Sequence, residues 1–369
     1  MKRAAAAAIS LMTGLAMLTG CSRAEVEETI QPLVADAIEE SDSEAEAVKE
    51  EDESPLIPEI DTDIKIHAGS RIAVVSKCVK GEYWKMVKKG MEDAVKEINK
   101  AYGYKKDDQI TMTFEGPDNE EDVETQINTI DAVIAENPDV LCISASDMDS
   151  CEAQLEAAKE NGIPVIAFDS NVAEKKLVKA YRGTDNVQVG KMAAYQLGSA
   201  LGKMGKVAVF SAQQKTKSVQ DRVEGFMNNI GKYGDIEVVE TIYSDQVDDM
   251  EASMKEVLEK YPTLDGVFCT NADITEMYLN LEKSDEHDEP ALVGVDATTK
   301  QQEAIRNGEE LGCVSQQPYA MGYQTIWAAV ETTAPKKSVV IEKNVLSNPA
   351  WIDADCLDDP DYSGYLYTE

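Results

Sequence analysis

The sequence predicts an α/β fold made of two parallel sheets, one in each of two lobes. From Arg71 onward, short apolar runs alternate with longer amphipathic stretches, as strands and helices alternate in sheets with right-handed crossovers. The strand candidates are apolar almost throughout, which is typical of strands covered by helices on both faces. About 300 residues follow Ala68, and this length suits two cores better than one.

The strands and helices are expected in regular alternation, with a switch from one sheet to the other near residues 184–186. The strand candidates are residues 72–75, 110–114, 140–143, 164–168, 206–210, 236–242, 266–269, 292–295 and 313–315. The helix candidates are residues 83–100, 123–136, 151–161, 187–202, 223–230, 250–260, 274–281 and 300–307. In the first helix the apolar residues fall on one face at a spacing of three to four, namely Trp84, Val87, Met91, Ala94, Val95 and Ile98.

The first residues have the pattern of a lipoprotein export signal. Two basic residues precede an apolar stretch, residues 4–18, that is shorter than the roughly 20 residues of a spanning helix. Leu18-Thr19-Gly20-Cys21 then matches the lipobox of bacterial lipoproteins. We expect removal of residues 1–20 as a signal peptide and lipidation of Cys21, which anchors the chain on the outer face of the cytoplasmic membrane, in the periplasm or at the cell surface. The alternative is an ordinary secretory signal with an incidental cysteine.

Residues 21–67 are expected to be a disordered acidic tether. Residues 22–66 are rich in Glu and Asp and contain no aromatic residue, so they cannot bury enough apolar surface to fold alone. A short solvated helix within this stretch is the alternative, and it would leave the spacer role unchanged.

Charge and composition argue against several classes of function. The net charge of −35 opposes nucleic-acid binding, because phosphates need a basic face. Neither histidine, His67 or His287, suits a Ser-His-Asp arrangement, and no glycine-rich phosphate-binding motif occurs. No catalytic residue, cofactor or metal site is therefore expected.

The six cysteines that follow Cys21 contain no C-x-x-C pair, so they give little support for a metal cluster. They are Cys78, Cys142, Cys151, Cys269, Cys313 and Cys356. We expect buried thiols, with Cys142 and Cys269 inside strands. A disulfide among the others stays open.

Polar side chains follow most of the strand candidates, where each strand ends. They include Lys77, Asp169, Asn271, Asp296 and Gln316. Ligands of open α/β sheets bind outside the carboxyl ends of the strands, so two facing sheets would surround one cleft with these groups. Carboxylates and amides can each engage neighbouring hydroxyls.

Aromatic and cationic side chains lie near the same predicted cleft, and alternatives stay open for several candidates. Tyr83 and Trp84 could pack a ring on the C–H face of a sugar, so the combination suits a polyhydroxylated ligand. Asp or Ser after a strand can simply cap the next helix, but for Asp169, Asn271 and Asp296 together we favour ligand contact. Arg222 reaches the cleft, or it pairs on the surface with Asp221 or Glu224.

The order and spacing of these segments resemble the ribose- and galactose-type substrate-binding proteins of bacterial ABC transporters, the type I periplasmic-binding fold. The likeness runs from about Arg71 to Leu346. Its segments are residues 73–77, 83–84, 98, 162–169, 183–186, 190, 222–226, 266–271, 292–296 and 314–318.

The resemblance implies two Rossmann-like lobes, joined by three crossovers, that close on a sugar. The N-lobe would contain residues 68–184 and 317–342, and the C-lobe residues 185–316 and 343–369. The hinges would lie near residues 184–185, 316–317 and 342–343.

The resemblance also assigns roles by position. Tyr83 and Trp84 match the stacking aromatics of the family, and Asp169, Arg222, Asn271, Asp296 and Gln316 match its polar set for hydroxyl groups. Two residues depart from the pattern. Ser170 stands where ribose binders often have Arg, and Gln246 stands where an aromatic residue is frequent. We therefore expect a ligand other than ribose. The tail, residues 347–369, matches no part of the family pattern.

The expected function is capture of a sugar-like ligand and its delivery to the permease of an ABC transporter. A sensor that presents the bound ligand to a chemoreceptor or histidine kinase is the alternative, because both roles use closed lobes. An enzyme is disfavoured by the missing catalytic groups. A DNA-binding repressor of the same fold is disfavoured by the signal peptide and the missing helix-turn-helix head.

Overall fold

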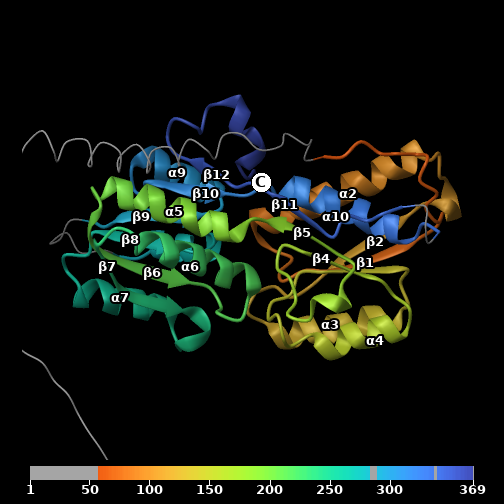
Figure 1. The fold of residues 1–369 in the computed structure, drawn as a ribbon, viewed down its shortest axis with the longest axis horizontal. Coiled ribbons are helices and arrows are strands. Elements are labelled where there is room, and N and C mark those ends of the chain that lie inside the picture. The colour runs from red at the N-terminus through yellow and green to blue at the C-terminus, as the bar shows by residue number, and fades with distance from the viewer. Residues whose placement is uncertain (1–56, 283–288, 336–338, 369) are drawn as a thin grey trace, which may run out of the picture. The chain divides into compact units, whose positions relative to one another are not determined.

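The computed structural model describes residues 57–282, 289–335 and 339–368. These residues contain two six-stranded sheets with helices on both faces, which confirms the predicted α/β class (Figure 1). They belong to one compact unit. The predicted signal peptide, Cys21 and His287 lie outside the described residues.

The first sheet, with its helices, forms the N-lobe. Its strand order is β11-β5-β4-β3-β1-β2, and all paired neighbours are parallel. The strands are β1 (Arg71–Val75), β2 (Thr111–Glu115), β3 (Val140–Ile143), β4 (Val165–Phe168), β5 (Ala180–Thr184) and β11 (Asn344–Ser347). One face carries α2 (Gly81–Ala101) and α10 (Pro318–Thr332), and the other carries α3 (Val123–Ala135) and α4 (Glu152–Glu160).

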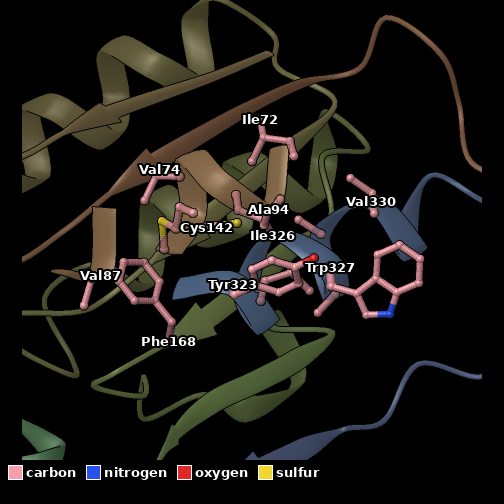
Figure 2. Close-up of a cluster of buried hydrophobic side chains, with 14 of the residues drawn as sticks. Ile72, Val74, Val87, Ala94, Cys142, Phe168, Tyr323, Ile326, Trp327 and Val330 are labelled. Atoms are coloured by element: carbon pink, nitrogen blue, oxygen red, sulfur yellow. The ribbon is translucent and has the colours of Figure 1, made fainter. Parts of the chain in front are cut away.

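The core between this sheet and the pair α2–α10 rests on a close helix–helix contact. A Cβ atom on Gly90 of α2 would lie 2.0 Å from the carbonyl oxygen of Tyr319, and one on Gly322 of α10 would lie 2.1 Å from that of Val87. Only glycine permits this approach from both sides. Figure 2 shows side chains of β1, α2, β4 and α10, among them Phe168 and Tyr323, gathered in the resulting core. This packing holds the start of α2 beside the ends of β1 and β4.

The second sheet, with its helices, forms the C-lobe. Its order is β12-β10-β9-β8-β6-β7, and only β12 is antiparallel to its neighbour. The strands are β6 (Met204–Ser211), β7 (Asp235–Tyr243), β8 (Gly266–Cys269), β9 (Ala291–Val295), β10 (Gly312–Ser315) and β12 (Ala350–Ile352). One face packs on α5 (Asn186–Ala200) and α6 (Lys217–Ile230), and the other on α7 (Met250–Lys260) and α8 (Ala272–Leu279). Helix α9 (Thr299–Asn307) packs beside β10 and the C-terminal tail.

The structure contains elements that the sequence pattern did not predict, namely β5, β11, β12 and α10. Helix α6 begins at Lys217 rather than at residue 223. The chain passes between the sheets after β5, after β10 and between β11 and β12. The first two passages lie at the predicted positions. The third prediction, at residues 342–343, is wrong because β11 pairs in parallel with β5, so residues 344–347 belong to the N-lobe sheet.

The six cysteines after Cys21 are all buried, and Cys142 and Cys269 lie in β3 and β8 as expected. Within the described ranges, no helix has the length and apolar character that crossing a membrane requires.

Candidate functional site

A cavity of about 820 Å³ is lined by residues that follow strands of both sheets. Its volume lies within the range of roughly 300–1,000 Å³ that is usual for small-molecule sites. All eight side chains proposed from the sequence line it, and they are Lys77, Tyr83, Trp84, Asp169, Arg222, Asn271, Asp296 and Gln316. The structure thus brings the whole predicted set to one place.

Asp169 is the centre of the N-lobe wall. It follows β4 directly, is 3% exposed, and has a left-handed backbone with φ of 53°, a conformation that Asp tolerates better than most residues. The hydroxyls of Tyr83 and Ser144 each donate to its carboxylate at 2.7 Å, and the Tyr181 hydroxyl donates to its carbonyl oxygen at 2.6 Å. These bonds fix the orientation of the carboxylate toward the cavity.

Lys77 and Glu120 complete the electrostatics of this wall. Lys77 is 4% exposed, and its Nζ lies 3.1 Å from Asp169 Oδ2 and 3.5 Å from Glu120 Oε2. Burial alone would lower the pKa of Lys77, but attraction to Asp169 and Glu120 outweighs it and raises the pKa. Burial would likewise raise the pKa of Asp169, yet Lys77 and the two hydroxyl donors lower it. Both groups are therefore charged at neutral pH.

The two aromatic candidates are buried in the N-lobe core where it meets the cavity. Tyr83 and Trp84 are 8% and 3% exposed, and their rings meet edge to face at 5.1 Å between centroids. Trp84 Nε1 donates to Glu120 Oε1 at 2.7 Å, and Lys77 Nζ lies 5.7 Å from the centre of its ring. The same carboxylate thus holds both the lysine and the indole.

Asp296 is the matching centre of the C-lobe wall. It follows β9, which has the same place in its sheet order as β4 has in the first sheet, and its φ is also left-handed at 80°. Its Oδ1 accepts from Gln316 Nε2 at 2.6 Å and from the Tyr367 hydroxyl at 2.9 Å. Its Oδ2 accepts from the backbone N–H of Ala272 at 3.0 Å.

The contacts of Arg222 and Asn271 decide between alternatives that the sequence left open for each residue. Arg222 is buried rather than on the surface, because its Nε donates to Asn186 Oδ1 and its Nη1 donates to the Thr270 carbonyl, both at 2.8 Å. Asn271 caps α8 by accepting from the N–H of Ile274, so the helix-cap reading is correct for its Oδ1. Its side chain still lines the cavity.

Part of the cavity lining is acidic. Asp273 and Glu276 of α8 line it together with Glu120. Loss of water contact, and then repulsion from the carboxylates of Glu120 and Glu276, raise the pKa of Asp273 to about 7. Asp273 is therefore partly protonated near neutral pH, and in that form it can donate as well as accept a hydrogen bond.

Hydrogen bonds join the two lobes at several points. The Ser170 and Ser218 hydroxyls lie 2.6 Å apart, and the Thr216 hydroxyl donates to the Ser146 carbonyl at 2.6 Å. Elsewhere, Glu82 Oε2 accepts from the N–H of Thr299 at 2.7 Å. The described conformation therefore has its lobes in contact around the site.

Three partners in the site were missing from the sequence prediction, namely Glu120, Tyr181 and Tyr367. Ser144 follows β3, so it was among the polar residues expected at the strand ends, but it was not assigned to the ligand site. Glu120 and Tyr367 lie in segments without any such signal, so only the folded chain reveals them.

A family model described as a periplasmic binding protein domain matches residues 72–337. The chain belongs to the periplasmic binding protein family. This membership confirms the resemblance inferred from the sequence. The family consists of binding proteins for transport.

Relatives in this family are import and binding proteins for sugars and polyols. The ribose import binding protein RbsB of Bacillus subtilis (strain 168) is 26% identical over 220 residues, which cover 60% of this chain and 71% of that protein. The xylitol-binding protein of Mycolicibacterium smegmatis is 24% identical, with 57% of this chain and 60% of that protein covered. The match thus spans less than two thirds of the latter protein.

Solved structures of the family share the fold over most of the chain. An ABC transporter solute-binding protein from Agrobacterium vitis with bound D-fucose has a TM-score of 0.72 at 26% identity, and covers 81% of this chain and 100% of its own. A second one from Agrobacterium vitis, bound with α-D-tagatopyranose, has a TM-score of 0.74 at 24% identity, with the same coverage. The relatives and neighbours of this chain are thus solute-binding proteins of sugar ABC transporters.

Proposed function

We propose that this protein captures a monosaccharide-like ligand between its lobes and delivers it to the permease of an ABC transporter. The observation that carries the proposal is the pair Asp169 and Asp296. They follow equivalent strands of the two sheets, both are buried, and both line one cavity. Charged acceptors on two walls suit a ligand with hydroxyls on opposite sides, because charge-assisted hydrogen bonds are the stronger ones.

The surrounding residues support a polar ring-shaped ligand. Arg222 and Gln316 add donors to the two carboxylates, and Tyr83 and Trp84 add apolar surface at the same cavity. Relatives that are named for their ligands bind ribose, xylitol and allose, all of which are polyhydroxylated.

The corner beside Asp169 supports a ligand other than ribose. Ser170 occupies the position where ribose binders often carry Arg, and its hydroxyl contacts Ser218 of the C-lobe rather than the cavity lining. The long cationic donor is therefore replaced by a contact between the lobes. We expect a hexose or a derivative with different bulk there.

The first residues of the chain support a site of action at the outer face of a membrane. The family is extracytoplasmic, and we propose that lipid on Cys21 holds the binding domain at the membrane beside its permease. The acidic stretch before residue 57 would act as the spacer between anchor and domain. The prediction that the tether extends to residue 67 is wrong, because Ile60, Ile64 and Ile66 pack on the N-lobe core and the Tyr102 hydroxyl donates to the Asp61 and Ile64 carbonyls at 2.9 and 2.8 Å.

A thermal-shift screen tests the function. The purified protein is heated with D-ribose, D-allose, D-fucose, D-tagatose and xylitol in turn. A ligand at 100 times its dissociation constant adds about 2.7 kcal/mol to the stability of the folded state, so a true ligand raises the melting temperature. The absence of any shift across the panel, together with no heat in calorimetry, contradicts the proposal.

Calorimetry on Asp296→Ala then tests the site. A hydrogen bond to a charged group contributes about 1.5–3 kcal/mol, so the affinity for the best panel sugar should fall roughly tenfold to a hundredfold. Asp245→Ala is the control, because Asp245 also follows a strand of the C-lobe but lies outside the cavity lining. Wild-type affinity in Asp296→Ala would remove this aspartate from the site.

A further inference from the structure

Residues 353–368 of the C-terminal tail run along the C-lobe and end beside Asp296, which lines the cavity. Cys356 and Leu357 pack into the cluster that contains Ile305 and Cys313. The N–H of Tyr367 donates to the Ala297 carbonyl at 3.0 Å. Further bonds from Gln302 to the Tyr367 carbonyl and from Ser315 to the Tyr365 carbonyl measure 2.8 and 2.5 Å. The backbone of the tail is therefore part of the C-lobe.

The side chain of Tyr367 leaves the C-lobe and enters the other core. It is 1% exposed and belongs to the N-lobe cluster that also holds Tyr83 and Trp84. The centroids of its ring and the Tyr83 ring lie 5.9 Å apart, within the range of 4.5–7 Å for favourable aromatic pairs. A single residue thus has its backbone bonded to one lobe and its ring packed in the other.

Tyr367 is also the counterpart of Tyr83 in an approximate internal symmetry. The Tyr83 hydroxyl donates to Asp169, and the Tyr367 hydroxyl donates to Asp296. Because the two rings touch, the residues form a continuous chain from one ligand-facing carboxylate to the other, in the order Asp169, Tyr83, Tyr367 and Asp296. The tail does not follow a strand whose carboxyl end faces the cavity, and the family pattern assigns it no role.

We propose that Tyr367 is a positioning residue of the ligand site, which fixes the Asp296 carboxylate and couples it through Tyr83 to the opposite wall. The proposal rests on the proposed function. It gives the tail the role of a specificity element: the orientation of Asp296, and with it the choice among hydroxyl epimers, depends on a residue that does not touch the ligand.

The hydrogen bonds of Asp296 show why one hydroxyl matters. A carboxylate offers about four acceptor sites, and Gln316, Tyr367 and Ala272 use three of them. The remaining capacity is thereby directed to one place. Without the Tyr367 hydroxyl, Oδ1 gains a free acceptor site, and the carboxylate can bind hydroxyls in more than one orientation.

Tyr367→Phe tests this, because it keeps the ring and removes the donor. In calorimetry with the best-binding panel sugar and its hydroxyl epimers, we expect affinity to fall roughly three- to tenfold and the affinity ratio between epimers to shrink. Tyr362→Phe is the matched control, since Tyr362 lies in the same tail but packs against the C-lobe cluster. A purely structural role for Tyr367 would leave the epimer ratio unchanged, and that result overturns the inference.

A second experiment tests the contact between the lobes without any ligand. Tyr367→Ala removes the ring from the N-lobe core, so small-angle scattering of the ligand-free protein should show a larger radius of gyration than the wild type, whereas Tyr362→Ala should not. An unchanged radius overturns the coupling between the walls. If the wild type binds no sugar of the panel, the proposed function fails, and the small-angle scattering experiment alone decides whether Tyr367 joins the lobes.

Discussion

The substitution Asp169→Asn isolates the charge of the buried aspartate beside the cavity. Asn keeps one side-chain oxygen that accepts from Tyr83 at the Oδ1 position, and the rotatable Ser144 hydroxyl can turn to accept from the new amide N–H. Asn also tolerates the left-handed backbone at this position. What is lost is the partner of Lys77, whose Nζ lies 3.1 Å from the carboxylate. The variant therefore reports on the buried ion pair rather than on backbone strain.

The expected magnitude follows from burial. Breaking a buried pair from one side costs about 3–5 kcal/mol, and Lys77 and Asp169 are 4% and 3% exposed. Glu120 remains 3.5 Å from the lysine with its side chain 21% exposed, so it offsets part of the loss. We expect a loss of about 3 kcal/mol in unfolding free energy at pH 7, the lower end of that range. A simple loss of a helix cap would cost about 1 kcal/mol.

Urea denaturation measures this loss of unfolding free energy. Its pH dependence shows whether the loss comes from the charge of Asp169. The pKa of Asp169 is lowered in the folded protein, so its stabilising effect is present above the unfolded value of about 3.9 and is lost as the pH falls through the folded pKa. The deficit of Asp169→Asn should therefore shrink in acid. Adding Lys77→Met should recover part of the stability, because no unpaired charge stays buried.

Asp147→Asn is the control for these measurements. Asp147 is also buried after a strand, but its lysine partner, Lys215, is exposed and lies 3.9 Å away, so the loss should stay under about 1 kcal/mol. A loss of under about 1 kcal/mol in Asp169→Asn, or a deficit equally large at pH 3 and pH 7, would refute the reasoning.

Three further predictions concern other parts of the chain. Glu310 is 1% exposed, and its Oε2 lacks a hydrogen-bond partner within the described ranges. Burial raises its pKa well above the usual value, so the folded state loses stability as the pH rises above the pKa that Glu310 has in the unfolded chain. Glu310→Gln should therefore raise the melting temperature at pH 7 more than at pH 4. A smaller increase at pH 7 than at pH 4 in calorimetry contradicts this. Cys21→Ala should move the protein from membranes into the soluble fraction of its host, and unchanged retention would count against lipidation. Glu82→Gln weakens the contact between the N-lobe and the N-terminus of α9, where a charge contributes about 0.3–1 kcal/mol. Ligand affinity in titration calorimetry should therefore fall roughly two- to fivefold. An unchanged affinity rejects a role for Glu82 in holding the lobes together around the ligand.

The sequence predicted strands well where burial on both faces demands an apolar run, as in β3 and β4. It did not predict β5, because Tyr181, Arg182 and Gly183 interrupt the pattern. The structure explains the buried arginine, whose Nη1 donates to the carbonyls of Tyr181 and Glu342 at 3.0 and 2.9 Å. Helix α10 was missed for the opposite reason. It is buried nearly all round, and such a helix has no amphipathic period to detect.

The sequence likewise predicted some residues of the candidate site and missed others. Residues at strand ends were found, because parallel topology brings those ends together. The groups that orient them were not, because Glu120 and Tyr367 come from a loop and from the tail. No local pattern links Tyr367 to Asp296, which is 71 residues away in sequence. The carboxylates that line the cavity were thus predictable, and the hydrogen bonds that fix them were not.

The position of α10 and β11 in the chain has a consequence for the order of folding. The N-lobe needs α10 against α2 and β11 beside β5, and the Tyr323–Glu97 bond alone joins residues 226 apart. This lobe cannot be completed until the entire C-lobe sheet except β12 has been synthesised. Contacts so distant in sequence slow the acquisition of native structure. For a protein that works outside the cytoplasm, that delay leaves time for translocation before a stable domain can form inside the cell.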